Sequence, residues 1–299
     1  MERQTVNIAY HYTSLEVFLK MLQGYNENNK VINFHGSYIS CMNDPLELKY
    51  GFRKVMEILP SIETELQIHN DNRLSHILAS EEVRGNFIKQ LNDKFKLPFV
   101  ICFSNHKDYL PQWEMYGNHG KGLSLGFDIQ NYYRVTMNNG KKVLDMTNFL
   151  DNQLRAIRVS YKSISLRHQF VSALNLFYHD YKLKIEQEKD IDRREVIIGQ
   201  TLNAIVFLLS SLIKHKAYSY ESETRILYPC NSINEIKYKT DSMGNIVPYM
   251  NIGIELSRLK KIVLGPRCDF VSAKLMLDTL FHQLGIKHIQ IVKSKIPYR

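Results

Sequence analysis

Two glutamates and an arginine alternate in the segment Tyr220-Glu221-Ser222-Glu223-Thr224-Arg225. If this segment is a β-strand, Glu221, Glu223 and Arg225 share one face, with neighbours in the row about 7 Å apart. One carboxylate could then stabilise a cationic transition state while the other accepts a proton from a nucleophile, and the guanidinium could hold a phosphate through two hydrogen bonds. The alternative is an edge strand with a structural Glu–Arg pair, and the pattern alone leaves both open.

Three further clusters of polar and aromatic residues are expected at strand ends, where rigid scaffolds present reactive groups. They are Tyr10-His11-Tyr12-Thr13, Cys102-Phe103-Ser104 and Gln112-Trp113-Glu114-Met115-Tyr116. His11 lies between an expected strand and a helix that Thr13 and Glu16 would cap, so it is either a ligand contact or a turn-stabilising residue. Trp113 and Tyr116 are one helical turn apart and could form either core or a platform for a flat ring.

Other chemistries have weaker support. Residues 117–122 are rich in glycine but lack the spacing of a phosphate-binding loop, so a plain turn is expected. Ser104 does not belong to a recognisable His–acid signature and Cys102 has no evident activating base, which leaves a hydrolase triad unsupported. Asn43-Asp44-Pro45 followed by Glu47 is typical of a helix start, although Asp44 and Glu47 with Glu223 could also hold a metal ion.

The periodicity predicts one α+β domain over residues 1–299, with a mixed, mostly antiparallel sheet. Helical segments at about 45–96 and 165–213 would pack on this sheet. A further helix is expected over 271–284. The expected strands are 6–10, 38–41, 99–104, 123–128, 132–137, 141–146, 225–228, 236–240, 246–254, 261–264 and 289–292.

Composition places the chain among ordinary folded proteins, with 299 residues, 44% hydrophobic and 23% charged. No stretch predicts a membrane span or a secretory signal, so a cytoplasmic protein is expected. The four cysteines show no CxxC spacing. The net charge is +9, and residues 258–299 hold nine bases against two acids. This surplus would attract an anionic partner such as nucleic acid, or it is simply a solubilising surface.

The order of the motifs HYTS, MNDPLE, ICFS, QWEMYGNHGKGLSLGFD, YESETRI and IPYR resembles a widespread bacterial family of unknown function. A looser similarity links the chain to ADP-ribosyltransferases. It rests on an early histidine followed by a hydroxyl residue, a middle strand that ends in serine, nearby aromatic residues and a late Glu-x-Glu. This second resemblance implies a split sheet and NAD as co-substrate.

The same resemblance implies roles for individual residues. The expected NAD contacts are His11, Thr13, Ser104, Trp113, Tyr116 and Arg225. Either Trp113 or Tyr116 would stack on nicotinamide. Glu223 would be catalytic by stabilising the oxocarbenium-like centre that forms as nicotinamide leaves, and Glu221 would orient or deprotonate the acceptor.

The leading hypothesis is therefore an NAD-dependent ADP-ribosyltransferase, a toxin-like or antiviral-defence effector that modifies a nucleic acid or a protein. An antitoxin or regulatory protein is the further partner that such a role implies. The alternative is a non-catalytic module that binds nucleic acid or protein, with the same residues in structural roles. A third hypothesis is a metal-dependent hydrolase or nuclease that uses Asp44, Glu47 and Glu223.

Overall fold

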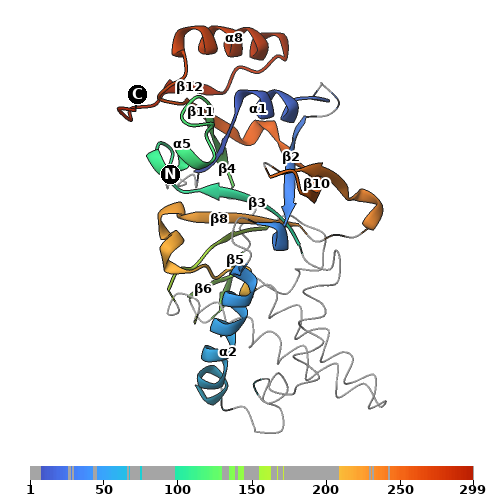
Figure 1. Cartoon of the computed structure of the whole chain (residues 1–299), viewed down its shortest axis with the longest axis vertical. Coiled ribbons are helices and arrows are strands. Elements are labelled where there is room, and N and C mark those ends of the chain that lie inside the picture. The colour runs from blue at the N-terminus through green and yellow to red at the C-terminus, as the bar shows by residue number, and fades with distance from the viewer. Residues whose placement is uncertain are drawn as a thin grey trace.

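The structure of the chain is a computed structural model with a mixed α+β fold (Figure 1). It describes residues 8–25, 28, 30–42, 46–65, 67, 75, 98–129, 135–138, 141–144, 155–162, 167, 171, 209–228, 230, 232–241 and 243–298. Within these residues the expected α+β class is confirmed, and the sheet is mostly antiparallel.

The main sheet contains ten strands in the described part of the chain. They are β1 (Ile8–Thr13), β2 (Val31–Tyr38), β3 (Phe99–Ser104), β4 (Leu123–Asp128), β7 (Arg155–Arg158), β8 (Glu223–Tyr228), β9 (Lys237–Thr240), β10 (Ile246–Glu255), β11 (Leu259–Leu264) and β12 (Gln290–Lys293). A separate hairpin pairs β5 (Val135–Asn138) with β6 (Lys141–Leu144), as the Asn-Asn-Gly turn predicts.

The sheet divides at β3. Along one edge, β3 pairs with β8 over its whole length, from Phe99 to Ser104. Along the other edge it pairs with β1 at Ser104 and with β2 at Val100 and Phe99. Since a strand has only two edges, β1 and β2 share one of them and diverge from there, β1 toward β4, β11 and β12 and β2 toward β10 and β9. Figure 1 shows the two branches above and beside β3.

The two faces of the sheet differ in polarity. Because directly paired residues share a face, Tyr10, Ser104 and Glu223 lie on one side of β1, β3 and β8. The opposite side is apolar, with Phe34 and Phe103 among its buried residues. Helices α1 (Leu15–Met21) and α8 (Phe270–Gln283) belong to the same apolar core. Tyr10, Ser104 and Glu223 therefore offer a site on the polar face, whereas His11, next to Tyr10 on β1, alternates to the apolar side and packs against Phe34.

The remaining helices among the described residues are short except for one. They are α2 (Glu47–Glu65), α5 (Leu110–Met115) and the 3-10 turns η1 (Ile39–Cys41), η4 (Lys216–Glu221), η5 (Ile233–Glu235) and η6 (Leu256–Arg258). The first residue of α2 contacts β8 at Arg225, and the helix then runs away from the sheet (Figure 1). Among the described residues, no helix has the length and apolar character that a membrane crossing requires.

Several expected boundaries are confirmed and others are wrong. Strands at 99–104 and 123–128 match β3 and β4 residue for residue. The expected strand at 38–41 is instead the turn η1, which follows the unpredicted strand β2. The cap of α1 is Ser14, whose Oγ accepts a hydrogen bond from Val17 N at 3.1 Å, because Thr13 still belongs to β1. The expected helix start at 43–45 lies outside the described residues, as do most of 66–97 and 163–208.

Candidate functional site

A cavity of about 220 Å³ lies where the sheet divides. Its wall includes five of the residues to which the sequence assigned catalytic or ligand-binding roles: His11, Ser104, Tyr116, Glu221 and Glu223. They come from β1, β3, the end of α5 and the segment that enters β8. The fold thus brings together chain segments that are about 90 to 120 residues apart in the sequence, as the hydrogen bonds from His11 to Cys102 and from Ser104 to Glu221 show.

Glu223 is the first residue of β8 and is held as a carboxylate. Its Oε1 accepts a hydrogen bond from Arg225 Nε at 2.7 Å, and its Oε2 accepts bonds from Arg225 Nη2 at 3.1 Å and Lys214 Nζ at 3.3 Å. Burial raises the pKa of this carboxyl, but the Arg225 guanidinium and the Lys214 ammonium outweigh that effect and hold the pKa at about 2. Glu223 therefore carries a negative charge at neutral pH.

Glu221 stands outside the strand. It ends η4, and Ser222 follows in the left-handed region with φ of 44°, so β8 begins only at Glu223. The expected row of three residues is thus wrong at Glu221 and holds for Glu223 and Arg225. The turn nevertheless brings the Glu221 carboxylate to the same ammonium, because Lys214 Nζ donates to Glu221 Oε2 at 2.5 Å.

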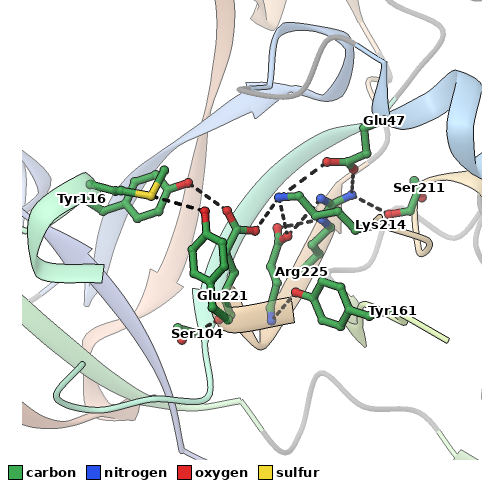
Figure 2. A network of polar contacts seen from close by, with 11 residues as sticks. Glu47, Ser104, Tyr116, Tyr161, Ser211, Lys214, Glu221 and Arg225 are labelled. Atoms are coloured by element: carbon green, nitrogen blue, oxygen red, sulfur yellow. Dashed lines mark hydrogen bonds and ion pairs between the residues drawn. The ribbon is translucent and has the colours of Figure 1, made fainter. Parts of the chain in front are cut away.

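The environment of Glu221 raises the pKa of its carboxyl above the usual value. Burial raises its pKa, and the hydrogen bond from Lys214 opposes this only in part. Tyr116 donates its hydroxyl to Glu221 Oε1 at 3.3 Å, which fixes the carboxylate against the cavity wall (Figure 2). The pKa values of the two glutamates are therefore shifted in opposite directions: Glu223 stays ionised, and Glu221 is the stronger base of the two.

Sequence analysis did not single out Lys214, which joins the acids of the site. Besides Glu221 and Glu223, its Nζ lies 3.7 Å from Glu47 Oε2 at the start of α2. Burial lowers the pKa of this ammonium, but Glu223, Glu221 and Glu47 outweigh the effect and hold it above its usual range. Lys214 is 5% exposed and lines the cavity. The ammonium is therefore a permanent cation of the site.

Arg225 forms the inner end of this network. It is fully buried and contacts the Glu47 carboxylate through Nη1. The same Nη1 donates to Ser211 O at 2.5 Å, and Nε and Nη2 donate to Glu223. Figure 2 shows the chain of contacts that runs from Tyr116 through Glu221 and Lys214 to Glu47 and Arg225. Buried charges are tolerated only when paired in this way.

His11 occupies the point at which the two branches of the sheet separate. Its Nδ1 lies 2.9 Å from Cys102 O, and since a carbonyl can only accept, Nδ1 carries the hydrogen. Cys102 is paired with neither β1 nor β2, so the imidazole satisfies a carbonyl that the divided sheet leaves open. The ring stands edge-on to Phe34 at 5.1 Å. Burial lowers the pKa of His11, which is therefore neutral with an accepting Nε2.

Ser104 links β3 to the turn that carries the carboxylates. Its Oγ donates to Glu221 O at 2.7 Å and accepts from His106 N at 3.2 Å. On the far side, the hydroxyl of Tyr161 accepts from Glu223 N at 3.0 Å. These bonds fix the backbone on both sides of Ser222, so the Ser104 hydroxyl positions the site while it lines the cavity.

Three expected ligand contacts lie away from the cavity. Trp113 is fully buried, packs edge-on to Tyr12 at 4.8 Å and donates Nε1 to Asp108 Oδ1 at 2.8 Å. Thr13 is buried at the end of β1, and Arg225 is buried behind Glu223. The structure therefore brings Tyr116, and not Trp113, to the place where a flat ring could stack.

The carboxylates of the site already form ion pairs with basic side chains of the protein. Glu47 and Glu223 both contact Arg225 and Lys214, and Asp44 lies outside the described residues. Within the part of the chain that the structure describes, no group of three or more His, Cys, Asp or Glu residues is arranged to hold a metal ion. The expected metal-ligand set thus has no support from this geometry.

Comparison with known protein families finds a match in the middle of the chain. Residues 112–226 match the model of DUF2971, described as a protein of unknown function. This stretch is similar to DUF2971 over somewhat more than a third of the chain. The match runs from α5 into β8, so the DUF2971 stretch contains Tyr116, Lys214, Glu221 and Glu223, whereas His11 and Ser104 precede it.

The resemblance to a family of unknown function is therefore confirmed, and the looser resemblance to ADP-ribosyltransferases is not. No curated protein and no solved structure is detectably similar to the chain.

Proposed function

We propose that this protein transfers ADP-ribose from NAD to an acceptor. The observation that supports this function is that His11, Tyr116, Glu221 and Glu223 line one cavity. It combines an ionised carboxylate, a carboxyl with a raised pKa, a neutral imidazole and an exposed part of an aromatic ring. Cleavage of a glycosidic bond requires a negative group near the cationic centre and a separate proton acceptor.

The two carboxyl groups suit different steps of this reaction. As the bond between ribose C1 and nicotinamide breaks, nicotinamide leaves with the electron pair, and the ionised Glu223 stabilises the positive charge that develops on the ribose. The acceptor then attacks C1, and Glu221 takes its proton, which its raised pKa favours. His11 Nε2 can accept a hydrogen bond from a ribose hydroxyl, and Tyr116 can contact the nicotinamide ring.

The size of the cavity limits what part of NAD it can hold. At about 220 Å³ it is smaller than typical ligand pockets, which measure about 300–1,000 Å³. Nicotinamide and its ribose would fill it, and the phosphates and adenosine would extend beyond its walls. The reacting end of NAD would thus be the enclosed end, which also keeps water away from the cationic centre.

Release of nicotinamide from NAD tests the proposal. We expect Glu221→Gln to lower the rate of ADP-ribose transfer to the acceptor by at least about 100-fold, because it removes the proton acceptor of that step without changing the shape of the side chain. Glu255→Gln is the matched control, since Glu255 is an exposed acid on β10 that we expect to leave the rate unchanged. Nicotinamide is separated by chromatography, and labelled NAD reports transfer to nucleic acid or protein in a cell extract.

Wild-type protein that neither releases nicotinamide nor labels an acceptor contradicts this function. That result would favour the non-catalytic module, in which the basic region 258–299 binds its partner and the carboxylates only hold the fold together. The toxin-like or defence role and the antitoxin or regulatory partner stay predictions that depend on transferase activity.

A further inference from the structure

A row of side chains crosses three strands beside the cavity. Tyr249 on β10 pairs with Ser37 on β2 and, on its other side, with Lys237 on β9. Directly paired residues share a face, and Lys239 follows on this same face two residues along β9. His35 and Ser37 belong to the cavity wall. The face that carries the two lysines is therefore continuous with the cavity.

Ring contacts hold this row in a fixed arrangement. The centroids of His35 and Tyr249 are 4.3 Å apart, with an angle of 40° between the rings. The Lys239 ammonium lies 5.5 Å from the centroid of Tyr249, within the range of a cation–π contact. Tyr249 is half-buried, whereas His35, Lys237 and Lys239 are exposed. A ligand would thus meet basic groups that are already positioned next to an aromatic surface.

The charge on this face is not balanced. Among the described residues, the ion pairs include neither Lys237 nor Lys239. The pKa of His35 is lowered by burial and then by the charges of Lys239, Lys237 and Lys20, which indicates a positive potential at the cavity wall. Inside the cavity, by contrast, the carboxylates have Lys214 and Arg225 as partners. The unmatched positive charge therefore lies just outside.

We propose that His35, Tyr249, Lys237 and Lys239 form a subsite for the diphosphate of a dinucleotide whose reacting end occupies the cavity. This inference rests on the proposed function and names how its substrate is held. Alternate residues of a strand are about 7 Å apart, so Lys237 and Lys239 can each reach one of two adjacent phosphates. The ring of Tyr249, next to the lysines, gives the ligand an apolar surface, and the small cavity leaves the diphosphate outside it.

Binding of ADP-ribose tests the subsite without turnover. The experiment uses the full chain with Glu221→Gln and compares the double variant Lys237→Gln/Lys239→Gln with Lys260→Gln/Lys293→Gln. The control pair removes two exposed lysines from β11 and β12, so both variants lose the same charge. We expect the β9 pair to weaken ADP-ribose binding by about 10- to 100-fold in calorimetry and to reduce its salt dependence, and the control pair to change it less than about 3-fold.

Two further ligands identify what the lysines recognise. Nicotinamide riboside has no diphosphate, so we expect the β9 pair to leave its binding unchanged. A single-stranded oligonucleotide of ten adenylates tests a nucleic acid as the source of phosphate. If the β9 pair weakens binding of this oligonucleotide and leaves ADP-ribose binding unchanged, the dinucleotide assignment is overturned.

The outcome also separates this inference from the proposed function. Should wild-type protein release no nicotinamide while ADP-ribose binding still depends on Lys237 and Lys239, the diphosphate subsite stands and the transferase activity fails. Equal ADP-ribose affinities in the β9 pair and the control pair, or no ADP-ribose binding at all, overturn the subsite. Thermal unfolding of both double variants checks that they are folded.

Discussion

Glu221 and Glu223 have equivalent places in the sequence pattern, but the fold shifts their pKa values in opposite directions. Glu223 faces a guanidinium that binds both of its oxygens, so ionisation is favoured. Glu221 has one oxygen on Lys214 and the other on the uncharged hydroxyl of Tyr116. Burial therefore dominates at Glu221 and ion pairing dominates at Glu223, which gives the site one fixed negative charge and one group that can exchange a proton.

This difference predicts opposite effects on stability for two matched substitutions. The pKa of Glu223 is about 2 in the fold against a usual value of 4.5, so its stabilising effect is complete above pH 4.5 and is lost as the pH falls through about 2. We expect Glu223→Gln to lower the free energy of unfolding at pH 7 by about 3 kcal/mol. Urea unfolding should show this loss shrinking from pH 4.5 downward.

Glu221→Gln is the matched comparison. The raised pKa of Glu221 means that its stabilising effect is present below pH 4.5 and is lost as the pH rises through the pKa of the folded state. A glutamine cannot ionise, so the stability of Glu221→Gln relative to wild type should rise with pH. Equal losses for both variants from pH 3 to pH 8 would contradict the assignment of different protonation states.

At the scale of residues, the sequence indicated the groups that line the cavity and the Glu–Arg pair behind them, but not Lys214, which joins the carboxylates. His11, Tyr116, Glu221 and Glu223 belong to polar clusters at strand ends, which local patterns can identify. Lys214 follows a long apolar run, where a single lysine is indistinguishable from the end of a helix. The signal that was missed is the spacing of Lys214, which precedes Glu221 by seven residues and Glu223 by nine.

Glu47 shows which contacts a local sequence pattern cannot predict. Its position after Asn-Asp-Pro predicts a residue that closes a helix cap, and it does begin α2. Its carboxylate, however, contacts Arg225 and Lys214, which are more than 160 residues later in the chain. Only the tertiary fold determines that contact, so no local pattern could have shown it.

At the scale of elements, α2 is fixed by a close approach to the segment before η4. A Cβ on Gly51 would lie 2.2 Å from Ser210 O, nearer than any real contact allows. Gly51 is one turn after Glu47, and Ser210 precedes Ser211, whose carbonyl accepts from Arg225. This glycine therefore lets the helix come close enough for Glu47 to reach Arg225.

Gly51→Ala tests this packing. We expect it to lower the free energy of unfolding by about 1–3 kcal/mol, because the added methyl must push α2 away from a backbone carbonyl and this outweighs the better helix propensity of alanine. Lys49→Ala is the control, since Lys49 is exposed on the same helix and should change stability by less than about 0.5 kcal/mol. If chemical denaturation gives the same midpoint for both variants, α2 does not depend on this contact.

Strands were predictable where their apolar residues form a continuous run in the sequence. β3 and β4 are short apolar runs bounded by a proline or by turn residues, and their limits were predicted correctly. β2 also alternates, with Ile32, Phe34, Gly36 and Tyr38 buried, but Gly36 interrupts the apolar series. A Cβ at Gly36 would lie 2.4 Å from Ile252 Cδ1 on β10, so a larger residue would require that side chain to move, and only the assembled sheet reveals this contact.

At the scale of the whole molecule, Asp108 ties the end of the chain to the region behind the cavity. Its Oδ1 accepts bonds from Trp113 Nε1 at 2.8 Å and Ser294 Oγ at 2.6 Å, and its Oδ2 accepts from Lys295 N at 2.7 Å. Trp113 packs with Tyr10 and Tyr12, both of which line the cavity. One carboxylate thus supports β12, α5 and the cavity wall together.

Asp108→Ala should destabilise the contacts that join β12, α5 and the cavity wall. It leaves the buried indole N–H, the Ser294 hydroxyl and the Lys295 amide without their acceptor, so we expect a loss of about 2–4 kcal/mol in the free energy of unfolding. Trp113 is the single tryptophan of the chain, which makes its fluorescence a specific reporter. Emission should be blue-shifted in wild type, where the ring is fully buried, and should move to longer wavelength in the variant.

Asp278→Ala supplies the control for charge and size. Asp278 is exposed on α8 and pairs with Lys274 one turn away, an arrangement that contributes about 0.5 kcal/mol or less. Its emission maximum should equal that of wild type. If Asp108→Ala has the same maximum and the same unfolding midpoint as this control, the C-terminal segment is not held through Asp108. The support of Trp113, and through it of Tyr10 and Tyr12, would then come from apolar packing alone.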